Sequence, residues 1–296
     1  MALLRLNLNF LGGLIAGIAL MWFQQAWWMM TKIHLESATE NHVQSPSLKD
    51  GAMTATATTN TADGWKTINV FYGDIEKSEF YTDKAWVSQA HQDEAVMALI
   101  GEKGYFIDLA SNHAVEFSNT YSLEKHGWNG LCIEPNPAYW YGLSHRKCQV
   151  VGSMVGAQKE QVQVKFRGVF GGIVGKMDEK LANFKKEPNA PIETRFTAPF
   201  VEVLEKYNVP PRIDYLSLDV EGAEHLIMKD FPWDHYTISV ITAERPSDDL
   251  KKLFTAQGYV FLKDLTWWGE TLWAHKSTGF TPKDPKVMSI PYDGRN

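Results

Sequence analysis

The spacing of apolar and polar residues changes along the chain, and these changes mark out a folded domain. From residue 105 onward, short apolar runs alternate with segments whose apolar residues recur every three or four positions, as in amphipathic helices. This alternation predicts a mostly parallel β-sheet with helices on both faces. The predicted strands are 105–110, 130–134, 149–155, 162–169, 214–220, 238–244, 259–265 and 270–276. The predicted helices are 84–102, 116–126, 137–146, 198–207, 223–229 and 248–257.

Two parts of this domain depart from the alternation. The last two strands are separated by the short turn 266–269, which predicts an antiparallel hairpin at one edge of the sheet. The glycine-rich segment 168–175 predicts a loop, and 176–199 fits neither period. We expect these two segments to select the ligand that the domain acts on.

The N-terminal part of the chain has a different pattern. Residues 10–30 carry no charge and are apolar apart from a glutamine pair, which is long enough for one helical pass across a bilayer. Tryptophans gather at the far end of this run, where aromatic rings favour the membrane interface. No small-x-small cleavage site follows, and no amphipathic face can be drawn. The sequence therefore predicts a short tail (1–9) and a transmembrane signal anchor (10–30), with the C-terminal domain in the lumen.

The anchor is followed by a polar, low-complexity segment. Residues 31–64 are rich in Ser, Thr, Ala and Asn and poor in large apolar side chains, so burial cannot offset the entropy lost on ordering the backbone. This composition predicts a flexible stem over 31–64 and a folded domain over 65–296.

Charge and cysteine content narrow the function. The net charge is −6 and no dense Lys/Arg cluster occurs, which argues against a nucleic-acid partner. Cys132 and Cys148 could form a disulfide across adjacent strands, but two buried thiols are the favoured interpretation. No Cys/His spacing indicates zinc, and no residue is assigned to a metal.

Acidic residues end two neighbouring predicted strands. Asp108 and Glu134 lie 26 positions apart, which fits a strand, a crossover helix and a parallel strand. Both carboxylates should reach the crevice where α/β sheets bind nucleotides, with Glu134 placed to accept ribose hydroxyls. The turn after Asp108 has no glycine, which disfavours close approach to a pyrophosphate. A nucleoside without phosphate, such as S-adenosylmethionine, fits this turn better.

A second acidic segment follows a later strand. Asp219, Glu221 and Glu224 lie close enough in sequence to raise one another's pKa, which is one way to make a general base near neutral pH. The same carboxylates could bind a hard cation, or Glu221 and Glu224 could cap the next helix. Glu244 should also point toward the crevice, with an ion pair to Arg245 as the alternative.

These segments resemble the FkbM-type class I methyltransferases. The matching stretches are FIDLASNHAVEFSNT (106–120), GLCIEPNP (130–137), DYLSLDVEGAE (214–224), AERP (243–246) and GETLWAH (269–275). The resemblance implies a Rossmann-like α/β fold with a seven-stranded, mostly parallel sheet, S-adenosylmethionine as cofactor, and methyl transfer to a hydroxyl oxygen. The cofactor-binding residues that it implies are Asp108, Ala110, Ser111, Asn112, Glu134 and Asn136. Asp219 would face the methionine end or the acceptor, with Glu221 and Glu224 as further catalytic candidates.

One departure from the family pattern concerns the turn after the first strand. The usual pattern is Asp-x-Gly-Ala-Asn-x-Gly, whereas Ala110 and Ala114 stand at both glycine positions here. This turn and the N-terminal anchor are also similar to the Star group of membrane-anchored proteins. Two hypotheses follow. The first is a methyltransferase in the endoplasmic reticulum or Golgi, acting on a glycan or other hydroxylated acceptor. The second is a weakly active or inactive membrane protein that moves protein cargo between these organelles.

Overall fold

The computed structural model describes residues 54–61, 64–71, 75–167, 170–175 and 191–294. The predicted tail and signal anchor, and the part of the predicted stem before residue 54, lie outside these residues. Within the described ranges, no helix is both long enough and apolar enough to cross a membrane.

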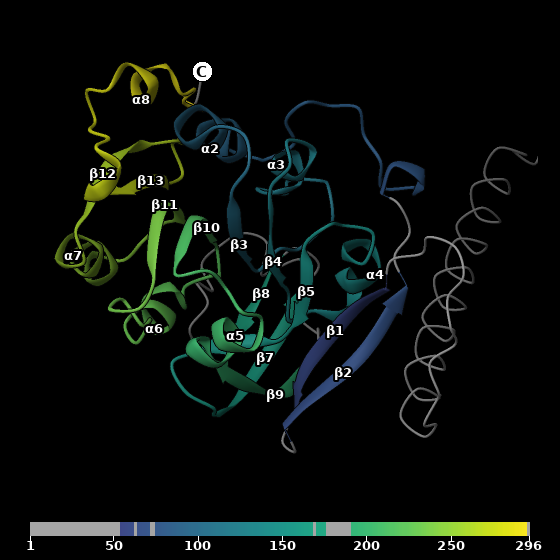
Figure 1. Cartoon of the computed structure of the whole chain (residues 1–296). Coiled ribbons are helices and arrows are strands. Elements are labelled where there is room, and N and C mark those ends of the chain that lie inside the picture. Colours follow the sequence, from purple (N-terminus) through teal and green to yellow (C-terminus); the bar gives the residue numbers. More distant parts are fainter. Residues whose placement is uncertain (1–53, 62–63, 72–74, 168–169, 176–190, 295–296) are drawn as a thin grey trace, which may run out of the picture. The chain divides into compact units, whose positions relative to one another are not determined.

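The described strands form two sheets (Figure 1). The larger sheet has nine strands in the order β12-β13-β11-β10-β3-β4-β5-β1-β2, and the smaller has four in the order β6-β9-β7-β8. The strands of the larger sheet are β1 (Thr54–Thr61), β2 (Gly64–Phe71), β3 (Tyr105–Leu109), β4 (Asn129–Ile133), β5 (Gln149–Gly152), β10 (Arg212–Leu218), β11 (Thr237–Glu244), β12 (Tyr259–Asp264) and β13 (Glu270–His275). Those of the smaller sheet are β6 (Met154–Gly156), β7 (Gln161–Arg167), β8 (Phe170–Ile173) and β9 (Ile192–Pro199).

The centre of the larger sheet is parallel, which confirms the predicted α/β class. β11, β10, β3, β4 and β5 are parallel neighbours. β13 and β12 continue beyond β11 as the predicted antiparallel hairpin. The chain builds β4 and β5 on one side of β3 and then returns to place β10 and β11 on the other side. The strand order therefore reverses between β3 and β10, and α/β sheets bind ligands outside the carboxyl ends of the strands at such a point.

Helices cover both faces of this sheet because successive side chains of each strand point to opposite faces. Phe106 and Tyr215 belong to one buried cluster, and their chain neighbours Ile107 and Leu216 belong to the other. The first cluster is completed by α2 (Gln92–Ile100), α3 (Tyr121–Lys125), α4 (Trp140–Leu143) and α8 (Pro285–Ser289), and the second by α5 (Phe200–Lys206), α6 (Glu224–Met228) and α7 (Asp248–Ala256). Short 3₁₀ helices lie at Ile75–Lys77 (η1), Pro137–Tyr139 (η2) and Lys276–Thr278 (η4).

The C-terminal end of the predicted stem is ordered as a strand, which corrects the prediction for these residues. β1 pairs with β2 in an antiparallel hairpin and with β5 in parallel. Its sequence alternates threonine with alanine, and β-branched threonine fits a pleated strand. Among the described residues, this hairpin adds strands before residue 65 to the larger sheet.

The smaller sheet corrects two further predictions. The apolar run 149–155 does not form one strand: it breaks at Ser153 into β5 and β6, which belong to different sheets. The segment 168–175 is not a plain loop, because it contains β8, which pairs with β7. A Cβ atom on Gly171 would lie 2.9 Å from the ring of Phe166. Glycine at this position therefore allows two strands to pack closely.

All six predicted helices are longer than the observed ones, and the first differs the most. α2 begins at Gln92 because Asp93 accepts the backbone N–H groups of Val87 and Ser88, which bends the preceding segment into a turn. α3 covers only Tyr121–Lys125 of the predicted 116–126.

The two cysteines form a disulfide, which corrects the expectation of buried thiols. Cys132 lies in β4 and Cys148 directly precedes β5, its parallel neighbour, with a Cα–Cα distance of 5.8 Å. Both residues are fully buried. Because disulfides persist in oxidising compartments, this bond bears on where the chain folds.

Candidate functional site

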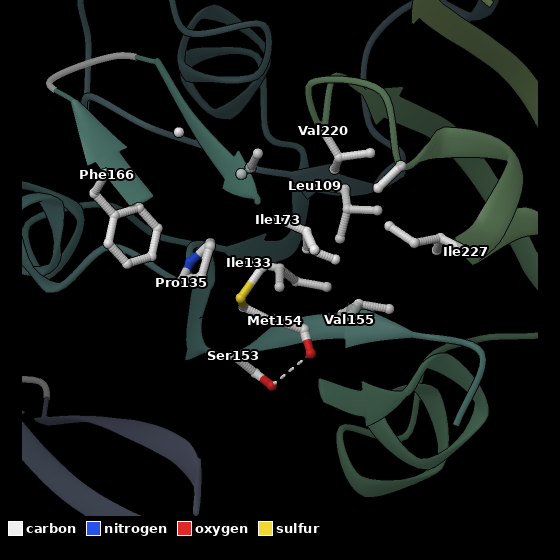
Figure 2. Close-up of a pocket in the computed structure, with 14 residues that line it drawn as sticks. Leu109, Ile133, Pro135, Ser153, Met154, Val155, Phe166, Ile173, Val220 and Ile227 are labelled. Carbon is white, nitrogen blue, oxygen red and sulfur yellow. Dashed lines mark hydrogen bonds between the residues drawn. The ribbon is translucent and has the colours of Figure 1, made fainter. Parts of the chain in front are cut away.

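An apolar pocket lies at the carboxyl ends of the central strands, where the strand order reverses (Figure 2). Leu109 at the end of β3 and Ile133 at the end of β4 line it from the larger sheet. Phe166 of β7 and Ile173 of β8 line it from the smaller sheet, and Val220 lines it from the turn after β10. The space between the lining residues, open solvent included, is about 490 Å³. Its apolar walls suit the flat ring system of a nucleoside.

The turn after β3 borders the pocket and adopts left-handed backbone geometry without glycine. Ala110 lines the pocket with φ +65°, and Asn112 has φ +56°. A left-handed conformation costs an L-residue roughly 1–2 kcal/mol, and asparagine tolerates it better than alanine. The backbone carbonyl of Ile133 accepts the N–H groups of Ala110 and Ser111 at 2.9 and 3.1 Å, which holds this turn against β4.

The two alanines at the family's glycine positions have different surroundings. Ala110 borders the pocket, whereas Ala114 is buried and does not line it. The Ala114 methyl faces Gly142 of α4, where an added Cβ would come within 3.2 Å of it. Of these two methyl groups, the one on Ala110 stands where a ligand would approach.

Glu134, the predicted ribose ligand, directly follows β4 and connects two turns. Its Oε2 accepts the N–H of Asn112 at 2.8 Å, and its Oε1 accepts the N–H of Asn136 at 2.6 Å. Glu134 is 4% exposed, and burial raises the pKa of its carboxyl to about 7 although both backbone N–H groups favour the ionised form. Its chain neighbours Ile133 and Pro135 line the pocket, so Glu134 is adjacent to the pocket in the chain. Glu134 itself is not one of the residues that line it.

Ser111 and Asn136, also predicted to bind the cofactor, are used within their own turns. The Ser111 hydroxyl donates to the backbone carbonyl of Asp108 at 2.8 Å. The Asn136 side-chain oxygen accepts the N–H of Ala138 at 3.1 Å and caps η2. Neither residue lines the pocket.

Asp108 belongs to a buried polar network behind the turn. Its Oδ2 accepts the hydroxyl of Thr120 at 2.5 Å, and that hydroxyl also accepts Nη2 of Arg146 at 3.0 Å. Arg146 pairs in turn with Glu124 at 2.9 Å, and all four residues are buried. Burial raises the pKa of Asp108, while Thr120 and Arg146 act in the opposite direction. The Asp108 carboxyl therefore holds the loop after β3 in place and does not line the pocket.

Carboxylates gather at the ends of β10 and β11. Oxygens of Asp219, Glu221 and Glu244 lie within 4.8 Å of one another, and Glu270 of β13 pairs in register with Glu244. Burial, followed by repulsion from Glu244 and Glu221, raises the pKa of Asp219 well above its usual value. Burial and Glu244 raise the pKa of Glu270 to about 8. Glu244 also forms the ion pair with Arg245, at 2.6 Å, that the sequence suggested as an alternative.

Glu224, the third catalytic candidate, shapes the turn after β10. Its Oε1 accepts the N–H groups of Val220 and Gly222 at 3.2 and 3.0 Å. Burial raises the pKa of Glu224, and these backbone donors oppose the shift. This arrangement agrees with the structural alternative, and it fixes the backbone that carries Asp219 and Glu221.

The structure therefore does not bring all the predicted site residues into one cleft. Ala110 lines the pocket, and Asn112 and Glu134 border it. Asp219 and Glu221 belong to the carboxylate cluster. The turn after β10 joins the two regions, because Val220 lines the pocket while its neighbours on both sides contribute to the cluster.

Sequence reasoning missed the pocket residues that the smaller sheet supplies. Met154 and Val155 come from β6, and Phe166 and Ile173 come from the β7–β8 hairpin. Two signals were present: Ser153 interrupts the apolar run after β5, and apolar residues alternate along β7. What the pattern did not show was that these strands leave the main sheet and fold over its carboxyl edge.

The strand order and this pocket define a doubly wound α/β protein, a class that binds ligands at the carboxyl edge of the sheet. The sequence model of the methyltransferase FkbM domain matches residues 73–261, and the chain belongs to this family of methyltransferase domains. Class I methyltransferase domains generally use S-adenosylmethionine. Comparison with curated proteins and with solved structures gave no match.

Proposed function

We propose that this protein is an S-adenosylmethionine-dependent methyltransferase that methylates a hydroxyl group of a glycan or another hydroxylated acceptor. The observation that carries the proposal is the apolar pocket at the reversal of strand order, bordered by Glu134. Family membership supports methyl transfer in general, and the residues present fit the adenosine part of the cofactor. The pocket walls offer an apolar surface for the adenine ring.

Glu134 is the residue that would hold the ribose. Each of its carboxylate oxygens accepts one backbone N–H group, which leaves further lone pairs for the two ribose hydroxyls. The two N–H groups also orient the carboxylate before any ligand arrives. Preorganisation of this kind lowers the entropy lost on binding.

The carboxylate cluster is the proposed acceptor side of the site. When bound, S-adenosylmethionine supplies an electrophilic methyl group, and an acceptor hydroxyl must lose its proton as it attacks. Asp219 and Glu221 follow the strand next to the pocket, and its raised pKa makes the Asp219 carboxylate a stronger base than an ordinary carboxylate. Glu224 is a positioning residue in this proposal, because its carboxyl is committed to the turn.

We further propose that the domain faces the lumen of the endoplasmic reticulum or Golgi, with residues 10–30 as its membrane anchor. The disulfide between Cys132 and Cys148 supports this location, since such bonds are rare in reducing compartments. A lumenal domain also has access to glycans and secreted proteins.

A second candidate function is the Star-like role of a weakly active or inactive membrane protein that moves protein cargo. Two observations favour it. Ala110 places a methyl group against the pocket, and both Glu134 oxygens are already hydrogen-bonded to the chain. These features would weaken cofactor binding without disturbing the fold.

Isothermal titration of the full chain in detergent micelles with S-adenosylmethionine separates the two candidates. The enzyme proposal predicts saturable binding that Glu134→Gln weakens about tenfold or more, because a charge-assisted hydrogen bond is worth about 1.5–3 kcal/mol. Glutamine is preferable to alanine, since it keeps one acceptor for the N–H groups of Asn112 and Asn136. The matched control is Glu205→Gln on the exposed side of α5. A folded chain that gives no heat at millimolar ligand would remove the enzyme proposal and favour the second candidate.

A further inference from the structure

The carboxylate cluster after β10 and β11 has the dimensions of a cation site. Oxygens of Asp219, Glu221 and Glu244 come within 4.8 Å of one another. Ca²⁺ binds oxygen ligands at about 2.3–2.6 Å, so two ligands on opposite sides of such an ion are about 4.6–5.2 Å apart. A single ion of this size can therefore contact all three carboxylates without a change in backbone.

One oxygen of the cluster is buried and lacks a hydrogen bond. Asp219 Oδ1 is enclosed by the protein and finds no donor among the described residues. Buried polar atoms nearly always have a partner, and an exception in a native fold calls for an explanation such as an ion. This observation is independent of the number of acids nearby, because it concerns one atom that the protein leaves unsatisfied.

The charge of the cluster is only partly balanced. With all three carboxyls ionised, as ligands of a cation, the cluster would carry −3, and Glu270 lies in register with Glu244 on the neighbouring strand. Arg245 supplies one positive charge through its ion pair with Glu244. At least one further positive charge would be needed to approach neutrality, which a divalent cation provides.

We infer that Asp219, Glu221 and Glu244 form a binding site for a hard divalent cation of the size of Ca²⁺. Carboxylate oxygens are the ligands that such cations prefer, and the three residues offer no nitrogen or sulfur ligand that would select a transition metal. Binding of the cation does not depend on the proposed function. The role of the cation does depend on it: beside the pocket, the ion would orient an acceptor hydroxyl and lower that hydroxyl's pKa, and Asp219 and Glu221 would then act as ligands of the ion and not as the proton acceptor.

Terbium is a suitable probe because Tb³⁺ takes the oxygen ligands of Ca²⁺ and emits when a nearby tryptophan is excited. Trp267 and Trp268 precede Gly269, whose carbonyl accepts the N–H of Arg245 at 2.9 Å, and Arg245 is the chain neighbour of Glu244. The experiment titrates the full chain in detergent micelles with Tb³⁺, in the absence of S-adenosylmethionine, and then displaces Tb³⁺ with Ca²⁺. The wild-type chain should give saturable luminescence at one site that Ca²⁺ abolishes.

Two variants assign the site. Asp219→Asn removes one negative charge and keeps the shape of the side chain nearly constant, and it should weaken Tb³⁺ and Ca²⁺ binding at least tenfold. Glu244→Gln removes a charge from a second proposed ligand and should weaken binding in the same way. Asp264→Asn, on the exposed side of β12, is the matched control and should bind as the wild type does. Ca²⁺ should also raise the melting temperature of the wild type and of Asp264→Asn, but not of Asp219→Asn.

Two results would overturn the inference: no saturable binding by a folded wild-type chain, or equal binding by the wild type and Asp219→Asn. In the first case Arg245 would be the counter-ion of the cluster. Because S-adenosylmethionine is absent from this experiment, neither result would bear on the methyltransferase proposal, which the cofactor titration tests separately.

Discussion

Two regions at the same edge of one sheet differ sharply in chemistry. The region over β3, β4 and β5 is an apolar pocket whose acidic neighbours, Asp108 and Glu134, are tied to groups of the chain. The region over β10, β11 and β13 gathers carboxylates, and the neighbouring Glu244 and Glu221 add to burial in raising the pKa of Asp219. The boundary between them runs through a single turn, because Val220 belongs to the pocket and Asp219 to the cluster.

The difference shows how one edge can hold two partners of a reaction. An apolar pocket gains affinity from buried surface and excludes water, whereas a cluster of like charges creates a site for a proton or a cation. In the proposed function, the first region holds the methyl donor and the second acts on the acceptor. Each prediction below should affect one region and leave the other unchanged.

The largest expected effect comes from filling the pocket. Ile173→Trp on β8 would place an indole among the lining residues, and we expect S-adenosylmethionine affinity to fall more than about 100-fold, equivalent to about 2.7 kcal/mol. Calorimetry measures the affinity, and Tb³⁺ binding should stay as in the wild type. Ile192→Trp is the control, because Ile192 is 56% exposed at the start of β9. Equal cofactor affinity in both variants would place the cofactor elsewhere.

The disulfide joins Cys132 of β4 to Cys148 just before β5, and its loss should reduce stability. Replacing Cys132 and Cys148 by alanine opens a link between residues 16 apart in sequence, which predicts a loss of about 3 kcal/mol in the free energy of unfolding. Urea denaturation measures it. The wild type should lose a similar amount in the presence of a reductant, whereas the variant should not respond to it. If wild-type stability ignores the reductant and all thiols remain titratable, the bond does not form in solution.

The ionisation of Glu134 should make cofactor binding depend on pH. Its pKa is raised to about 7 by burial, and ribose hydroxyls donate to the ionised form, so binding favours loss of the proton. Affinity should therefore rise about tenfold between about pH 6 and about pH 8, the window around this pKa. Glu134→Gln should flatten the profile. A wild-type affinity that is constant or falls over this range contradicts the assigned role.

The smallest effect concerns the two alanines at the family's glycine positions. Ala110→Gly relieves a left-handed alanine at the pocket's border, and we expect a gain of up to about 1 kcal/mol in stability and a few-fold gain in cofactor affinity. Ala114→Gly is the matched comparison and should lose about 1 kcal/mol, because its buried methyl packs on Gly142. Thermal unfolding gives both values. The same sign for both variants would mean that backbone strain does not distinguish these positions.

Much of the main sheet was predictable because most central strands are short segments dominated by apolar residues. β3, β4 and β11 fall within one residue of the predicted ends, and the β12–β13 hairpin follows from its short turn. The smaller sheet was not predictable in the same way. Whether an apolar run such as 149–155 stays in one sheet depends on tertiary pairing, which periodicity does not encode.

The candidate site shows the same limit. The sequence correctly placed Asp108, Glu134 and Asp219 at or just beyond the ends of neighbouring strands. It could not show where each carboxyl points, because that depends on distant partners such as Thr120 for Asp108. The disulfide was one of two open alternatives for the same reason: it required knowledge that β4 and β5 are neighbours.

The most direct test of the central claim is to locate bound S-adenosylmethionine on the chain. Ultraviolet crosslinking of radiolabelled S-adenosylmethionine to the full chain, followed by peptide mapping, reports which residues lie beside it. The account predicts label on peptides that contain Pro135, Met154 or Phe166, and no label on the Ile173→Trp variant. Label confined to other peptides, or equal labelling of that variant, would contradict the claim that the apolar pocket holds the methyl donor.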